Sequence, residues 1–247
     1  MASSGEQPGS SFDPPKDAPG RRSYRRRFFR AALWWVGLPA VAYVTVCVGM
    51  MWQEESFIFF PSRFPEGDWR PSLPVEDAWF EAADGVRLHG WFLAHPQPRR
   101  VVLYCHGNAG NITHRADILE DIHRFLDASV LVWDYRGYGR SEGRPTERGV
   151  LLDAEAARNW LAKRTGWATD RLVLWGHSLG GAVAVHLAAA GGAEALVLES
   201  TFTCLPDVAA HHYPWLPVRL LMRNRLDALG LISQYHGPLF QSHGQAD

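Results

Sequence analysis

Cysteine is scarce in this sequence and follows no metal-binding spacing. The 247 residues include only Cys47, Cys105 and Cys204, and an odd number at these distances implies neither a disulfide framework nor a zinc site. Cys105 lies in an apolar run, which is typical of a small buried residue rather than a reactive thiol. The sequence therefore implies no metal, and no motif implies an organic cofactor.

A basic surface spread over a folded domain is also missing. The formal net charge is −1, yet residues 1–30 hold seven basic and three acidic residues, which leaves 18 basic and 23 acidic residues in the remainder. A nucleic-acid-binding domain would distribute its positive charge over a folded face. Here the charge forms one short run beside an apolar stretch, so we expect a membrane and no nucleic acid as the partner.

One long apolar run is present near the N-terminus. Residues 1–20 are rich in Ser, Gly, Pro and Asp and are expected to be disordered. We expect residues 21–52 to form a basic flank and a transmembrane anchor. Residues 31–51 carry no charge, and as a helix they would span about 30 Å, the thickness of a bilayer core. Tryptophans stand near both ends of this run, where aromatic belts lie.

Three other export signals compete with an uncleaved anchor. A cleaved signal peptide has a shorter apolar core, followed by a cleavage site of small residues of the A-x-A type, and we find no such site. A lipoprotein site at Cys47 is weakened by Val46, and residues 25–30 resemble a twin-arginine signal. We favour the uncleaved anchor, with the arginines cytoplasmic and residues 53–247 on the far, periplasmic or extracytoplasmic side.

Beyond the anchor, short apolar runs alternate with helical patterns. A hairpin is expected around Asp84-Gly85. The further expected strands are 101–105, 129–133, 171–175, 195–198 and 238–242, and the expected helices are 113–126, a helix capped by Thr146, and 181–190. This alternation predicts an α/β fold with a mostly parallel sheet and helices on both faces. In such sheets, sites lie at the carboxyl ends of the strands.

The strongest chemical signal is Gly176-His177-Ser178-Leu179-Gly180, which stands between an expected strand and an expected helix. In that context G-x-S-x-G predicts a nucleophile elbow. The glycines relieve crowding at the sharp turn, and the helix N-terminus favours developing negative charge at Ser178. The alternative is a glycine-rich turn with an incidental serine.

Two further loops follow expected strands. His106-Gly107-Asn108-Ala109-Gly110 can present a backbone N–H to an oxyanion; we assign the N–H of Asn108 as one donor and that of Leu179 as the other. The alternative is a turn that binds no ligand. In the run 134–141 we expect Asp134 and Arg136 to pair and to shape the pocket without a catalytic role.

Taken together, these motifs resemble the α/β-hydrolase superfamily, and more closely its serine-aminopeptidase-like hydrolases with an N-terminal membrane anchor. The resemblance rests on F-F-P-S at 59–62, the hairpin, HGN at 106–108, D-Y-R-G-Y-G-x-S at 134–141, GHSLG at 176–180 and L-E-S-T-F at 198–202. It implies that Ser178 is the nucleophile, while His106, Gly107, Gly176, His177 and Gly180 support the loop and the elbow.

The triad acid implied by the resemblance is Asp247, which ends an H-G-x-x-D run and is the last residue. The superfamily places the catalytic histidine after the acid, together with a last helix and strand that we expect to be missing here. We interpret the chain as a fragment rather than a degenerate product, and as inactive without its base.

The resemblance also implies a short cap at 204–230 in a hydrolase domain at 53–247. The apolar residues of this cap suit a small-molecule or lipid-like acyl substrate, or they serve core packing. The expected function is a membrane-anchored serine hydrolase that cleaves an ester, thioester or amide through an acyl-enzyme. The alternatives are a peptidase of the same fold and a catalytically silent, membrane-tethered binding module.

Overall fold

The computed structural model describes residues 21–244. It divides into two compact units, Met1–Gly49 and Met50–Asp247, which we describe separately. The expected disorder of residues 1–20 and the acid Asp247 lie outside the described residues.

The first unit is helical throughout its described part. Helix α1 (Arg21–Ala32), a wider π-helical turn (η1, Leu33–Gly37) and α2 (Leu38–Trp52) follow without a break, and the last three residues of α2 belong to the second unit. Pro39 lies in the first turn of α2, where its missing N–H is tolerated next to the wider turn. Within the described residues, one helix (Arg25–Trp52) is long and apolar enough to cross a membrane.

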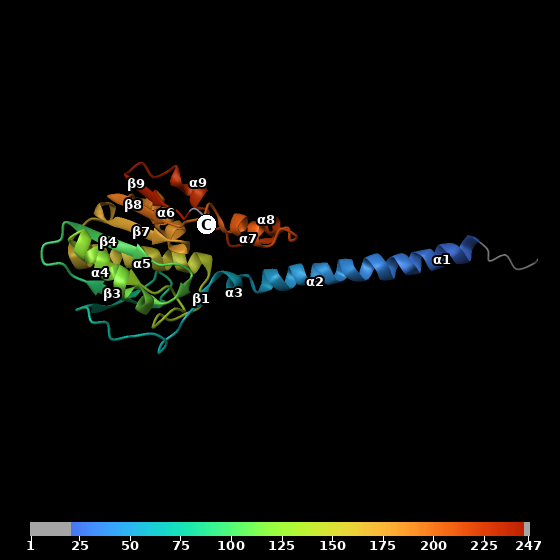
Figure 1. The fold of residues 1–247 in the computed structure, drawn as a ribbon, viewed down its shortest axis with the longest axis horizontal. Coiled ribbons are helices and arrows are strands. Elements are labelled where there is room, and N and C mark those ends of the chain that lie inside the picture. The colour runs from blue at the N-terminus through green and yellow to red at the C-terminus, as the bar shows by residue number, and fades with distance from the viewer. Residues whose placement is uncertain (1–20, 245–247) are drawn as a thin grey trace, which may run out of the picture. The chain divides into compact units, whose positions relative to one another are not determined.

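The second unit is built on a seven-stranded sheet in the order β2-β3-β6-β4-β7-β8-β9. Strand β3 runs antiparallel to its neighbours β2 and β6, and the other neighbours are parallel. The labelled strands β3, β4, β7, β8 and β9 follow one another across the sheet in Figure 1. The strands are β2 (Glu76–Glu81), β3 (Arg87–Leu93), β4 (Arg100–Cys105), β6 (Ala128–Trp133), β7 (Val173–His177), β8 (Ala195–Glu199) and β9 (Leu239–Ser242). The expected hairpin and parallel strands are confirmed.

Helices cover both faces of this sheet. Alternate residues of β4 point to opposite faces, so that Leu103 packs in a core with helices α5 (Glu147–Thr165) and α6 (Leu179–Gly191). Tyr104 instead packs in a second core with α4 (Ala116–Phe125), which follows the short 3₁₀ turn η2 (Ile112–Arg115). The fold class is therefore confirmed. Thr146 caps α5 as expected, since its hydroxyl accepts a hydrogen bond from the Gly149 N–H at 3.1 Å.

Several short elements were not expected from the sequence. A two-residue strand β1 (Phe60–Pro61) pairs with β5 (Ala109–Gly110), which ties the start of the domain to the H-G-N loop. The remaining helices are α3 (Glu54–Ile58), η3 (Thr169–Arg171), α7 (Leu205–His212), α8 (Val218–Leu221) and α9 (Ala228–Ile232). Helices α7 and α8 lie within the expected cap 204–230, and α9 begins in it and ends two residues beyond it.

Candidate active site

Ser178 stands alone between strand β7 and helix α6, on the bend that the motif predicted. Its φ of +53° and ψ of −116° are unusual for a residue with a side chain, and such strain is kept where the surrounding structure enforces it. A Cβ at Gly180 would collide with the carbonyl oxygen of Cys105, and one at Gly176 would collide with that of Gly180. Both glycines are thus required by close approach of the backbone.

Three hydrogen bonds hold the backbone of Ser178. Its N–H donates to the carbonyl of Glu199 at 2.8 Å, and its carbonyl accepts from the Gly181 N–H at 2.9 Å. The same carbonyl accepts from the Thr201 hydroxyl at 3.1 Å. Sequence reasoning missed Thr201, although it belongs to the L-E-S-T-F run that begins at the end of β8. This threonine also explains Gly181, because a Cβ there would collide with the hydroxyl of Thr201.

The H-G-N loop lies directly beside the elbow. Strands β4 and β7 pair with Cys105 opposite Gly176, so the residues that follow them stay adjacent. A Cβ at Gly107 would lie 3.6 Å from the Cβ of Ser178. Within residues 21–244, the N–H groups of Asn108 and Leu179 donate no hydrogen bond. The structure therefore brings together the two loops that were predicted to share a site.

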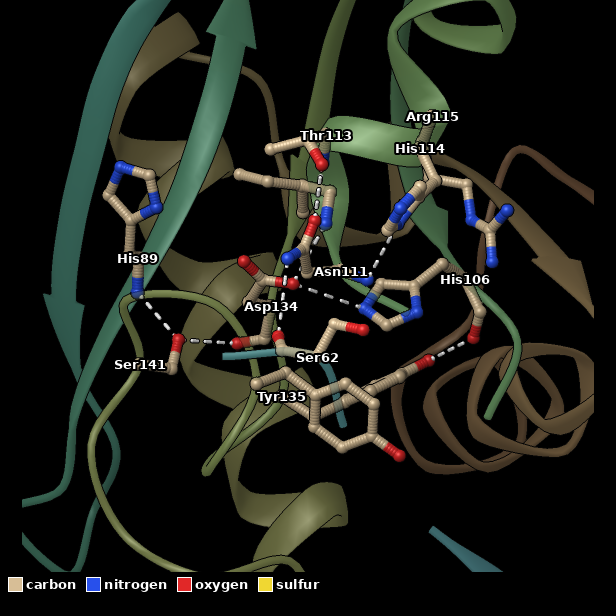
Figure 2. A network of polar contacts seen from close by, with 12 residues as sticks. Ser62, His89, His106, Asn111, Thr113, His114, Arg115, Asp134, Tyr135 and Ser141 are labelled. Atoms are coloured by element: carbon tan, nitrogen blue, oxygen red, sulfur yellow. Dashed lines mark hydrogen bonds and ion pairs between the residues drawn. The ribbon is translucent and has the colours of Figure 1, made fainter. Parts of the chain in front are cut away.

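Side chains from the 134–141 run fix the orientation of this loop. His106 Nδ1 lies 2.7 Å from the carbonyl oxygen of Gly107, which belongs to the same peptide unit as the Asn108 N–H. The Tyr135 hydroxyl donates to the carbonyl of His106, and that of Tyr138 to the carbonyl of Asn108, each at 2.7 Å. The peptide that carries the Asn108 N–H is thus held at its own carbonyl and by bonds to the two neighbouring carbonyls. Figure 2 shows the bond from Tyr135 to His106.

His106 and Asp134 form a fully buried pair behind the loop, with Nε2 and Oδ1 3.7 Å apart (Figure 2). Burial lowers the pKa of His106 to about 3 and raises the pKa of Asp134 well above its ordinary value. Asp134 Oδ1 accepts from the Ile112 N–H at 3.0 Å. Both shifts favour the uncharged forms, so the pair supports the loop as a neutral contact.

The expected pairing of Asp134 with Arg136 is wrong. Arg136 instead bonds the carboxylate of Asp153 on α5, at 2.7 Å, and that of Asp84 in the β2–β3 turn, at 2.8 Å. A local sequence pattern cannot reveal these partners, because they are 17 and 52 residues away. Arg136 and Asp153 are buried, so the expectation of a structural role agrees with their surroundings.

Other predicted site residues lie where their motifs place them. His177 is half-buried beside Gly107, whose Cβ would lie 3.1 Å from His177 Nδ1. Cys105 is fully buried, as expected, and desolvation raises the pKa of its thiol to about 12. Among the described residues, no group of three His, Cys, Asp or Glu side chains could hold a metal ion.

A serine on a strand–helix elbow, at the carboxyl edge of a mostly parallel sheet and beside a glycine loop, defines an α/β hydrolase. The sequence profile described as "Serine aminopeptidase, S33" matches residues 96–231. The chain is 40% identical over 218 residues to an uncharacterised protein of Mycobacterium tuberculosis, covering 85% of this chain and 77% of that protein. This chain belongs to the serine aminopeptidase S33 family of α/β hydrolases.

Two further comparisons agree with this assignment. The α/β hydrolase domain-containing protein WAV2 of Arabidopsis thaliana is 39% identical over 180 residues, covering 71% of this chain and 55% of that protein. The crystal structure of an esterase of Pyrococcus furiosus superposes with a TM-score of 0.60 at 21% identity, covering 74% of this chain and 75% of that one. At that identity the likeness concerns the fold alone.

Proposed function

We propose that this chain belongs to a membrane-anchored serine hydrolase that cleaves an ester, thioester or amide bond through an acyl-enzyme. The observation that carries the proposal is the placement of Ser178 on the β7–α6 bend, directly beside Gly107 of the facing loop. A Cβ at Gly107 would lie 3.6 Å from the Cβ of Ser178. In this mechanism the Ser178 hydroxyl attacks the acyl carbonyl, and the N–H groups of Asn108 and Leu179 hold the oxyanion.

The base and the acid complete the proposed triad. A serine hydroxyl is a weak nucleophile unless an adjacent base accepts its proton. We assign the acid to Asp247, which lies outside the described residues, and the base to a histidine that follows it in the family order of nucleophile, acid and histidine.

The membrane part of the proposal concerns residues 31–51. The support is the one helix within residues 21–244 that is long and apolar enough to cross a membrane, together with the arginines at its start. Positive charge stays on the cytoplasmic side of a membrane span. We therefore place the N-terminus in the cytoplasm and the hydrolase domain on the far side.

The substrate class follows from the apolar cap, residues 204–230, whose base starts five residues after the Glu199 carbonyl that holds Ser178. The apolar side chains of the cap favour a small or lipid-like acyl group. A peptide substrate is the competing choice within the same chemistry, and the family description of an aminopeptidase favours it.

Turnover of two substrate classes tests the proposal. The protein expressed from the full reading frame that contains residues 1–247 is assayed with p-nitrophenyl acyl esters and with aminoacyl p-nitroanilides. We expect ester hydrolysis that Ser178→Ala abolishes and that the exposed control Ser233→Ala leaves intact. Preference for the anilides would move the assignment to the peptidase, while a folded protein that hydrolyses neither would support a silent binding module.

A further inference from the structure

The tip of the cap carries apolar side chains that core packing does not explain. Leu216, in the segment between α7 and α8, and Val218, the first residue of α8, are buried, with 6% and 7% of their surface exposed. Their neighbours Trp215 and Leu220 are 57% and 86% exposed. Leu216 and Val218 are already buried, whereas Trp215 and Leu220 expose most of their side chains, so the outer pair needs another explanation.

The base of the cap is closed and well held. The Leu205 N–H donates to the carbonyl of Arg225 at 2.8 Å, and this bond joins the two ends of the cap segment. The Arg219 guanidinium bonds the carboxylate of Asp207 at 2.9 Å, which links α8 to α7. The tip is therefore presented by a braced structure and not by a loose loop.

Hydrogen bonds tie this cap to the last turn of the candidate membrane span and to Glu54, just after it. Arg223 donates from its guanidinium to the carbonyl of Met51 at 3.0 Å. Buried Glu54 accepts from the backbone N–H of Arg223 at 3.0 Å and of Asn224 at 2.8 Å. Met51 lies in the last turn of the candidate span Arg25–Trp52. These contacts lie wholly within the second unit.

Chain geometry then limits how far the tip can be from a bilayer. If the span crosses a membrane, Met51 lies at the interface, and Arg223 lies within a hydrogen bond of it. Leu220 is three residues from Arg223, so its backbone lies at most about 11 Å from that of Arg223. The side chain of Arg223 adds its own length between that backbone and Met51. The headgroup layer on each side of the hydrocarbon core is about 5–8 Å deep, so the tip is close enough to the end of the span to reach it.

We propose that residues 213–220 form a second membrane contact, in which the cap tip lies in the interfacial layer of the bilayer that the anchor crosses. Tyr213 and Trp215 are the side chains that favour this layer, and Arg219 and Arg223 beside them suit lipid phosphates. This inference rests on the proposed anchor but not on the proposed hydrolysis. It implies that acyl substrates reach the cap from the lipid side.

Spin-label depth measurements test the contact. The full chain, in a Cys47→Ala/Cys204→Ser background, is reconstituted in nanodiscs of phosphatidylcholine and phosphatidylglycerol and labelled at L220C. The span is marked by V44C, and the control is F125C, since Phe125 is an apolar residue, 72% exposed, at the end of α4. Collision with oxygen is compared with collision with a water-soluble nickel chelate.

We expect the ratio of oxygen to nickel collisions at 220 to exceed that at 125 several-fold and to lie below that at 44. Equal ratios at 220 and 125, with a lipid signal at 44, would overturn the inference and leave the anchor intact. If the label at 44 collides mainly with the water-soluble nickel chelate, both the proposed anchor and the proposed contact of the cap tip would be overturned. Spin–spin broadening at 220 that grows with the number of copies per disc would assign the tip to a second copy of the chain and likewise contradict the membrane contact. Because no turnover is measured, failure here leaves the hydrolase proposal to its own test.

Discussion

At Ser178 the backbone takes a conformation that few side-chain-bearing residues adopt, and a neighbouring threonine helps to hold it there. The Thr201 hydroxyl bonds the Ser178 carbonyl at 3.1 Å. Thr201→Val keeps the shape of the side chain and removes this bond. A lost hydrogen bond of about 1 kcal/mol would lower kcat about fivefold, with KM little changed. Steady-state kinetics checks this, and Thr201→Ser, which keeps the hydroxyl, serves as the matched control. A Ser variant as slow as the Val variant would mean that the methyl group matters and the bond does not.

The neutral pair behind the oxyanion loop makes a prediction about pH. The pKa of His106 is lowered by burial to about 3, so its contribution to stability is complete above about pH 6.5 and is lost as pH falls toward about 3. The pKa of Asp134 is raised by burial, so its contribution is complete below about pH 3.9 and is lost as pH rises.

Asp134→Asn removes the second of these effects, because an amide does not titrate. We expect the free energy of unfolding of the variant, relative to that of the unmodified protein, to increase from about pH 4 to about pH 8. Urea unfolding at several pH values measures this difference. A relative stability that falls as pH rises would show that Asp134 is ionised and stabilising in the fold.

Where a motif fixes local geometry, the structure places the residues as the sequence predicted, while their catalytic roles stay predictions. Ser178 and its two glycines are determined by the bend itself, and Gly107 by the register of β4 against β7. The partner of Arg136 could not be predicted, because Asp153 meets it only once α5 packs on the sheet. Thr201 was missed for the same reason, since its contact with Ser178 joins two neighbouring strand ends.

Among the elements, helix α5 is joined to the β2–β3 hairpin by a buried ion pair and by an exposed one. Arg136, with 8% of its side chain exposed, bonds Asp153 on α5 and Asp84 in the hairpin turn. Arg164 at the end of α5 bonds Glu76 on β2 at 2.7 Å, and both of these side chains are about half exposed.

Arg136→Met should destabilise the fold by about 3–5 kcal/mol, because it leaves the carboxylate of Asp153 buried and unpaired. Arg164→Met, the matched control, should cost about 1 kcal/mol or less, since solvent screens the exposed pair. Denaturant unfolding compares the two variants. Equal losses would mean that the burial of the Arg136 pair has no energetic consequence.

Elements with a strong hydrophobic period were predicted from sequence, and short ones were not. The strands of the central sheet are continuous apolar runs, and α5 has a cap and a helical period, so both were expected. Strand β1 has two residues and pairs with a segment far along the chain. Helices α7, α8 and α9 are short, and prolines at 214 and 217 separate the first two, which leaves no period to detect.

For the whole molecule, the distribution of charge predicts the topology. A reporter that is active only in the periplasm, fused after Gly85, should be active, because the arginines before the span stay in the cytoplasm. Replacing Arg25, Arg26 and Arg27 with Asn should reduce that activity, whereas Arg99→Asn and Arg100→Asn, beyond the span, should not. An inactive reporter in the unmodified chain would reverse the assigned orientation.

The fold as a whole was predicted because alternation of strand and helix restricts the topology to a few choices. The chemistry depends on fewer atoms: a strained serine, the amides of Asn108 and Leu179, and a loop held by His106, Tyr135 and Tyr138. The roles of Asn108, Leu179 and Asp247 stay predictions, and they follow from the family order of the motifs.

The central claim is that the Ser178 hydroxyl is an activated nucleophile in the complete enzyme. Its most direct test is to react the protein expressed from the full reading frame with a fluorophosphonate, to digest it, and to analyse the peptides by mass spectrometry. We predict one adduct, on the peptide that carries Ser178, which is lost in Ser178→Ala and kept in Ser233→Ala. A folded protein that stays unmodified at Ser178, or that carries its adduct on another serine, would contradict the account.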